Sequence, residues 1–276
     1  MHFPRWRLLS DPPQSPQRNM AVDEAVATAF WQGTVPPTLR FYRWAAPALS
    51  IGKFQSPPSS WSDALNAQAI PLVRRVTGGR GILHGQQDGE ITYSLIADSR
   101  ATPFSGGIRQ TFHAISAGFI AGLNMLDIDA QMYVPPATSS FSSHPQKRHP
   151  LCFSTVSRDE VTAQGKKLLG SAQRRWPSYF LQQGCMALER NAHHPNDQIA
   201  LRDLGGPGLT WQAVEAALVR GMETALSIRL ELCTLTSKEQ RMADRLAAEK
   251  YLHDDWNLYH RLPSCIRTDP LAVYYA

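Results

Sequence analysis

The stretch from His149 to Arg175 constrains this chain most, because it places a cysteine upstream of a lysine flanked by glycines. Cys152 stands in the apolar setting H-P-L-C-F, and Lys167 stands in G-K-K-L-L-G-S-A. Glycines on both sides of the lysine pair let a backbone approach a ligand closely. A nearby cation lowers the pKa of a thiol and makes its thiolate a strong nucleophile. A lysine on a neighbouring strand would supply that charge, so the pair predicts acyl transfer through a thioester.

A second stretch, from Arg74 to Leu95, joins an apolar run to an alternating run through a loop rich in Gly, Arg and His. The backbone N–H groups and fixed cations of such a loop suit an anionic or carbonyl-bearing ligand. The loop is not a nucleotide-binding Walker loop, because G-x-x-x-x-G-K-[ST] is missing from it.

These stretches, with others along the chain, resemble the biotin/lipoate cofactor-transferase superfamily and most closely its LipM-type octanoyltransferases. The resemblance covers nearly the whole chain, and the motifs follow one another in the family's order. They are N-M-A-V-D-E-A at 19–25, L-R-F-Y-R-W at 39–44, L-S-I-G-K-F-Q at 49–55, R-R-V-T-G-G-R-G-I-L-H at 74–84, E-I-T-Y-S at 90–94, C-F at 152–153, G-K-K-L-L-G-S-A-Q-R-R at 165–175 and K-Y-L-H-D-D-W-N at 250–257.

The resemblance implies an α+β fold of the biotin/lipoate protein ligase (BPL/LPL) catalytic-domain type, with mixed sheets flanked by helices. We expect residues 1–276 to form a single catalytic domain. A short C-terminal extension begins after about residue 256 and is too short for a separate accessory domain.

The resemblance also implies a reaction and its residues. An octanoyl group would move from acyl carrier protein, through a Cys152 thioester, to a lysine of a lipoyl-accepting protein such as glycine cleavage H protein, without ATP or another cofactor. Cys152 and Lys167 would be catalytic, while Lys166 would face solvent because adjacent strand positions face opposite ways. Gly78 and Gly79 would line the acyl tunnel, and His84 would orient the loop or the incoming amine. The full set of expected substrate-binding residues is Arg74, Arg75, Thr77, Gly78, Gly79, His84, Thr92, Gly170, Ser171 and Ala172.

Two departures from the family's pattern leave alternatives open. The loop after His84, G-Q-Q-D-G-E, is longer than the usual H-D-x-E connection, and L-Q-Q-G-C at 181–185 replaces L-Q-H-G-S. Gln183 therefore stands where a histidine is usual, and Cys185 adds a thiol. An ATP-dependent lipoate-protein ligase acting through lipoyl-adenylate is one alternative, against which Cys152 argues. A non-catalytic carrier-binding protein is another, although it would have no need of Cys152 and Lys167.

The composition bears on partners and location. A net charge of +5 and a pI near 9.1 favour acidic partners. Lysines and arginines are scattered without a nucleic-acid motif, so we expect acidic carrier domains and no nucleic acid. The four cysteines lack C-x-x-C spacing, which predicts no metal. No apolar run approaches the roughly 18 residues of a membrane span, and the N-terminus lacks a signal-peptide pattern, so a cytoplasmic enzyme is expected.

Periodicity predicts alternating helices and strands. Asn19 is expected to cap a helix that stops at Gly33, Thr210 a later helix, and Thr236 a third through a capping box. A further helix is expected over 108–123 and a short one near 61–69, while 135–150 has the composition of an exposed loop. Strands are expected at 38–43, 48–53, 70–74, 91–96, 151–155, 159–163, 167–171 and 179–186.

Overall fold

The computed structural model describes residues 4–58, 61, 65, 67–85, 87–134, 160–190 and 199–267. Its largest sheet is mixed, and β1 runs parallel to both of its neighbours, β2 and β12, whereas the other pairs are antiparallel. The strands of this sheet, in spatial order, are β10 (Gly170–Arg175), β11 (Tyr179–Ala187), β6 (Gln87–Asp98), β2 (Thr38–Trp44), β1 (Arg5–Gln14) and β12 (Arg229–Leu232).

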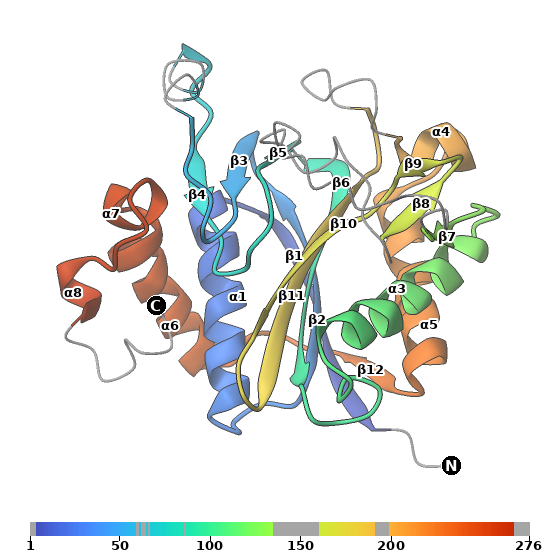
Figure 1. Ribbon diagram of the computed structural model, residues 1–276, viewed down its shortest axis with the longest axis horizontal. Coiled ribbons are helices and arrows are strands. Elements are labelled where there is room, and N and C mark those ends of the chain that lie inside the picture. Colours follow the sequence, from blue (N-terminus) through green and yellow to red (C-terminus); the bar gives the residue numbers. More distant parts are fainter. Residues whose placement is uncertain are drawn as a thin grey trace, which may run out of the picture.

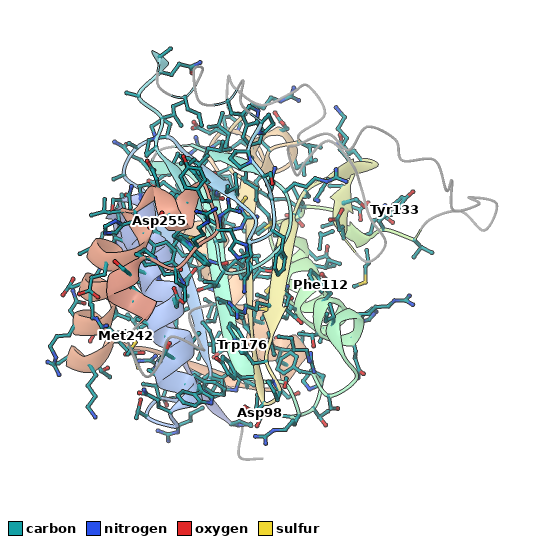
Figure 2. The ribbon with its side chains drawn as sticks, turned by 60° about the vertical axis from the view of Figure 1, so that its left-hand side comes forward. Asp98, Phe112, Tyr133, Trp176, Met242 and Asp255 are labelled. Carbon is teal, nitrogen blue, oxygen red and sulfur yellow. The ribbon has the colours of Figure 1, made fainter. Side chains whose placement is uncertain are left out.

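Helices cover both faces of the main sheet (Figure 1). On one face lie α1 (Pro16–Trp31) and α6 (Ser237–Leu246), which continues into a π-helix over Ala247–Tyr251. On the other face lie α3 (Ile108–Asn124) and α5 (Trp211–Leu226). In Figure 2, Met242 on α6 and Phe112 on α3 accordingly lie on opposite sides of the sheet.

Alternation along β2 explains the two cores. Leu39 and Phe41 pack with the apolar side chains of α3 and α5, whereas Tyr42 and Trp44 pack with those of α1. Successive side chains of a strand point to opposite faces, so this central strand with helices on both sides is buried nearly throughout.

Glycines let α3 and α5 approach each other closely. A Cβ on Gly122 would come within 2.6 Å of the Ala217 carbonyl oxygen, and a Cβ on Gly118 within 2.4 Å of the Met222 sulfur. A Cβ on Gly221 of α5 would likewise overlap the backbone of α3. Ile115, Phe119 and Leu123 on α3 are fully buried, whereas Ile108 at the start of the same apolar stripe is 55% exposed.

Two small sheets and three short helices complete the described fold. One sheet has the order β4 (Leu72–Arg74), β3 (Ala48–Ile51), β5 (Ile82–His84), and lies at the upper end of the main sheet in Figure 1. The other has the order β7 (Gln131–Met132), β8 (Val161–Ala163), β9 (Lys166–Lys167). The short helices are α4 (Leu201–Gly205), α7 (Asp254–Asn257) and α8 (Ser264–Arg267). No helix in the described part of the chain is long and apolar enough to cross a membrane.

The expected α+β fold with mixed sheets flanked by helices is confirmed, as are the caps at Thr210 and Thr236. The expected cap at Asn19 is wrong. Ser15 caps α1 by accepting from the Arg18 N–H, and Asn19 is buried inside the helix. The expected strand over 167–171 is interrupted, because β9 ends at Lys167 and β10 begins at Gly170. The predicted loop at 135–150 and strand at 151–155 lie outside the described residues, as does most of the short helix near 61–69.

A buried ion pair ties β1 to α6. Both terminal nitrogens of Arg7 donate to the Glu239 carboxylate, at 3.0 and 2.6 Å, and that carboxylate also accepts from the Thr236 N–H at the start of α6. Burial alone would raise the pKa of Glu239, but the hydrogen bonds from Arg7 and Thr236 outweigh it and hold that pKa below its usual value. The pair therefore fixes the helix against the sheet in its charged form.

We predict that Arg7→Ala destabilises the protein by about 3–5 kcal/mol, the usual cost of leaving a buried charge without its partner. Arg5→Ala is the matched control, because Arg5 also pairs with a glutamate, Glu231, but at the surface. It should cost roughly 0–1 kcal/mol. Urea unfolding of both variants measures the difference, and equal losses would contradict the assignment.

The pH dependence of this contribution has a defined sign. The folded-state pKa of Glu239 is lowered, so the stabilisation is present above the unfolded carboxyl pKa of roughly 4.3 and is lost as the pH falls through the folded value. The gap in unfolding free energy between the wild type and Arg7→Ala should therefore narrow in acid.

Candidate functional site

A pocket of about 380 Å³, counting the open space at its mouth, lies where β2, β6 and β11 meet the loop between β4 and β5. Its lining consists of Met20, Tyr42, Trp44, Ser50, Arg75, Gly79, Arg80, Ile82, His84, Thr92, Gly170, Ser171, Ala172, Gln183, Gly184 and Cys185.

The pocket brings together the two stretches that stand out in the sequence. Several of the residues expected to bind substrate line the pocket, namely Arg75, Gly79, His84, Thr92, Gly170, Ser171 and Ala172. The first three come from the R-R-V-T-G-G-R-G-I-L-H motif, and the last three open β10 directly after G-K-K-L-L. Their contact with substrate remains a prediction.

Arg74 has a different position. Its guanidinium is buried and donates to a ring of backbone carbonyl oxygens, and its own carbonyl accepts from the Trp256 indole at 2.8 Å. Burial lowers the pKa of Arg74 to about 10. Arg74 thus anchors the C-terminal segment to β4 and is not part of the described pocket lining. The carbonyl acceptors belong to Gly52, Lys53, Gln55, Trp256 and Leu258.

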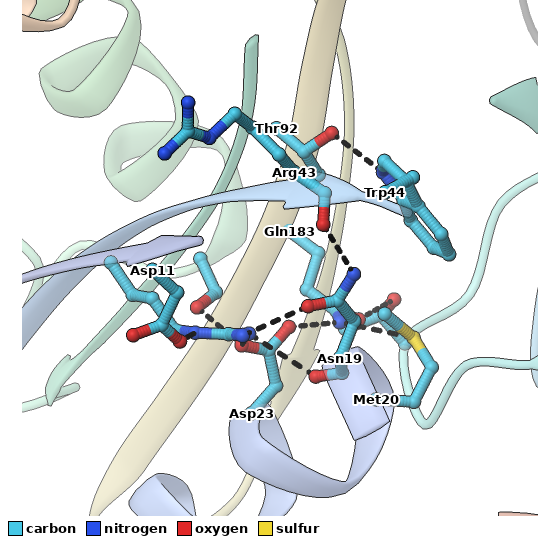
Figure 3. Close-up of polar contacts among 11 residues, drawn as sticks. Asp11, Asn19, Met20, Asp23, Arg43, Trp44, Thr92 and Gln183 are labelled. Carbon is cyan, nitrogen blue, oxygen red and sulfur yellow. Dashed lines mark hydrogen bonds and ion pairs between the residues drawn. The ribbon is translucent and has the colours of Figure 1, made fainter. Parts of the chain in front are cut away.

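Thr77 and Gly78 are not part of the described pocket lining. The Thr77 hydroxyl donates to Gln183 Oε1 at 2.7 Å, and the Gly78 carbonyl accepts from Arg75 at 3.0 Å. Gln183 in turn donates to Asp23 of α1 at 2.6 Å (Figure 3). Gln183, which stands where the family usually has histidine, is therefore fully bonded and joins the glycine loop to the main sheet.

The predicted orientation of the lysine pair is confirmed. Lys167 is 3% exposed and Lys166 is exposed. Lys167 Nζ donates to Glu160 Oε1 at 2.7 Å, and the lysine lies three residues before the pocket-lining Gly170. Cys152 lies outside the described residues, so its position relative to Lys167 remains a prediction.

A chain of hydrogen bonds crosses one side of the pocket and includes two residues that sequence reasoning did not select, Ser50 and Glu90. Ser50 Oγ lies 2.6 Å from His84 Nε2, and His84 Nδ1 lies 2.7 Å from Glu90 Oε1. The imidazole stacks on Trp44 with ring centroids 3.8 Å apart and an interplanar angle of 14°. Ser50 lies in the motif L-S-I-G, and Glu90 lies in the motif E-I-T-Y-S. These two motifs were the sequence signal that could have identified both residues. Although the loop after His84 is longer than is usual in the family, His84 still lies within hydrogen-bond distance of Glu90.

Neighbouring groups determine the charges at the two ends of this series of hydrogen bonds. Burial alone would raise the pKa of Glu90, but His84, the Thr92 hydroxyl at 2.5 Å and the Gly85 N–H at 3.2 Å together hold that pKa below its usual value. At the other end, Arg75 Nη1 donates to Ser50 Oγ at 2.7 Å. An ionised carboxylate thus stands at one end of the chain and a guanidinium at the other.

Cys185 brings a thiol to the same place. Its sulfur lies within 4.8 Å of ligand atoms of His84 and Glu90, a grouping that could in principle hold a metal ion. Both ring nitrogens of His84 are already hydrogen-bonded, however, so a metal would have to displace Ser50 or Glu90. The hydrogen-bonded arrangement fits these donors better than coordination does.

The pocket combines an apolar part with a polar part. Met20, Trp44 and Ile82 contribute apolar surface, while Arg75 and His84 contribute donors and acceptors. Such a lining suits a ligand with a hydrocarbon chain and a carbonyl or carboxyl group.

Comparison with known proteins agrees with this geometry. Residues 15–221 match the family model of the lipoyl protein ligase A/B catalytic domain. The chain is 38% identical over 273 residues to octanoyltransferase LipM of Kyrpidia tusciae, covering 91% of this chain and 98% of that protein. It is 31% identical to octanoyltransferase LipM of Bacillus subtilis, covering 91% and 97%.

A solved structure shares the fold. A protein from T. acidophilum, solved with bound lipoic acid, superposes with a TM-score of 0.74 at 24% identity and covers 94% of this chain and 100% of its own. The sequence match, the fold and the pocket agree, and the chain belongs to the lipoyl protein ligase A/B catalytic domain family.

Proposed function

We propose that this protein is an octanoyltransferase of lipoate assembly that moves an octanoyl group from a carrier thioester to a protein lysine through Cys152. The observation that carries the proposal is the convergence of the two family motifs on one pocket with an apolar part and a polar part. The LipM octanoyltransferases that match over 91% of the chain support the choice of acyl group.

In the first half-reaction, the Cys152 thiolate attacks the carbonyl carbon of the octanoyl thioester. The bond from carbon to the carrier sulfur breaks, the carrier leaves as a thiol, and the octanoyl group stays on the enzyme. Lys167 is buried and carries the charge suited to stabilise both the thiolate and the oxyanion that develops on the carbonyl oxygen.

In the second half-reaction, a lysine amine of the acceptor attacks the acyl-enzyme and forms an amide. Exchange between thioesters is nearly balanced in free energy, whereas conversion of a thioester into an amide is downhill. The reaction therefore needs no ATP, which separates it from the ligase route through an acyl-adenylate.

We further propose a lipoyl-domain protein such as glycine cleavage H protein as the acceptor and octanoyl-acyl carrier protein as the donor, both in the cytoplasm. A net charge of +5 favours encounter with an acidic carrier domain. The pocket-lining Arg75 and Arg80 add positive charge beside the site.

We predict that Cys152 becomes acylated. After incubation with octanoyl-acyl carrier protein, intact-protein mass spectrometry should show one added octanoyl group on the wild type and none on Cys152→Ser. Cys185→Ser is the matched control, because it removes a thiol that lines the pocket, and it should still be labelled.

A parallel incubation with ATP and lipoate separates the alternatives. Product formation by Cys152→Ser that depends on ATP would identify a ligase. Product formation by the wild type without any acyl-enzyme would exclude the covalent route, and binding of carriers without product would indicate a non-catalytic protein.

Lys167→Ala should slow acylation of the enzyme on the order of a hundredfold or more, the usual effect of removing one donor to an oxyanion. Lys166→Ala is the control on the same strand and should change the rate little, because Lys166 is exposed. Single-turnover acylation kinetics measure both rates. Equal effects at the two positions would show that the wrong lysine has been assigned.

A further inference from the structure

We propose that His84, held by Glu90 and connected to the pocket through Ser50, takes the proton from the acceptor lysine in the second half-reaction. The inference rests on the proposed function and adds a step that neither Cys152 nor Lys167 performs. A lysine side chain has a pKa of roughly 10.4 and enters as an ammonium ion, which has no lone pair with which to attack. Some group in the site has to accept that proton.

When the imidazole of His84 is neutral, its two hydrogen-bond partners fix which ring nitrogen carries the proton. The ionised Glu90 can only accept, so His84 Nδ1 donates to it across 2.7 Å. Arg75 can only donate, so Ser50 Oγ accepts from Arg75 and turns its own proton toward His84 Nε2, 2.6 Å away. Nε2 therefore holds a lone pair that points at a hydroxyl in the pocket lining.

The same arrangement stabilises the product of proton transfer. Protonation of Nε2 creates an imidazolium next to the Glu90 carboxylate, which Thr92 and Gly85 keep ionised and in place. Thr92 is held in turn by the Trp44 indole N–H at 3.0 Å (Figure 3), and Trp44 also stacks on the imidazole. The base is thus fixed in tautomer, orientation and charge partner.

Other charged or titratable groups also face His84. Glu90 approaches from β6, Cys185 from β11, and Arg75 acts through Ser50 from the loop after β4. Arg80 lines the same pocket. His84 is thus hydrogen-bonded to the Glu90 carboxylate on one side and connected through Ser50 to the Arg75 guanidinium on the other.

The acceptor ammonium passes one proton to Ser50 Oγ, whose own proton moves to His84 Nε2. The neutral amine attacks the thioester carbonyl carbon, a carbon–nitrogen bond forms, and the carbon–sulfur bond breaks with its electron pair returning to the Cys152 sulfur. The second amine proton neutralises the departing thiolate, and His84 releases its proton to solvent.

The test starts from isolated octanoyl-enzyme, which is mixed with a lipoyl-domain acceptor while loss of the octanoyl mass is followed. Once acylated, His84→Gln and Ser50→Ala should transfer the octanoyl group to the acceptor about 10²–10⁴-fold more slowly than the wild type, the usual contribution of a general base. His113→Ala, which removes an exposed histidine on α3, should match the wild type. Hydroxylamine, which is neutral at neutral pH, should discharge wild type and variants at the same rate because it needs no base.

The pH profile adds a readout that a purely structural role would not change. In His84→Gln, the transfer rate should keep rising toward the pKa of the acceptor lysine, whereas the wild-type rate should level off at a lower pH. Equal slowing with lysine and hydroxylamine, or loss of acylation in His84→Gln, would overturn the assignment of His84. Normal transfer in Ser50→Ala would overturn the relay. A wild type that never gains the octanoyl mass would instead reject the proposed function, and this step with it.

Discussion

The buried ion pair between Arg40 of β2 and Asp23 of α1, 2.6 Å apart and without exposed side-chain surface, is the contact on which the site depends. Asp23 also accepts from Ser94 of β6 and Gln183 of β11, and Gln183 accepts from Thr77 of the glycine loop (Figure 3). One carboxylate thus connects a helix, three strands and the loop that walls the pocket. Charges buried this deeply are tolerated only when every partner is present, so the network specifies one arrangement of these elements.

Much of the fold could be predicted because its patterns are local. The apolar stripe of α3 and the caps at Thr210 and Thr236 depend on residues within a turn or two of each other, and the structure has all three. Strand β1 was not predicted, because Pro12 and Pro13 interrupt its pattern. The structure tolerates them because β12 pairs only with Arg5 to Leu8, which leaves the prolines beyond its end, where the register with β2 shifts.

The sequence predicted which residues gather at the site, but not which of them face the pocket and which stabilise the surrounding backbone. Motifs placed Arg75, His84 and Gly170 around one pocket, yet adjacent Arg74 turns away to bind backbone carbonyls near the C-terminus. Which of two neighbouring arginines faces a ligand depends on tertiary contacts across 182 and 184 residues, and no local pattern records these. Glu90 was missed although it lies only 6 residues from His84, because its role depends on how β5 and β6 bring the two side chains together.

In the proposed reaction, the pocket between the glycine loop and β10 holds the acyl chain. A crystal structure of the isolated octanoyl-enzyme tests it most directly. We expect the hydrocarbon chain to lie along Met20, Trp44 and Ile82, with the thioester carbonyl toward Lys167 and with His84 still bonded to Glu90. An octanoyl chain bound elsewhere, with this pocket filled by solvent alone, would contradict it.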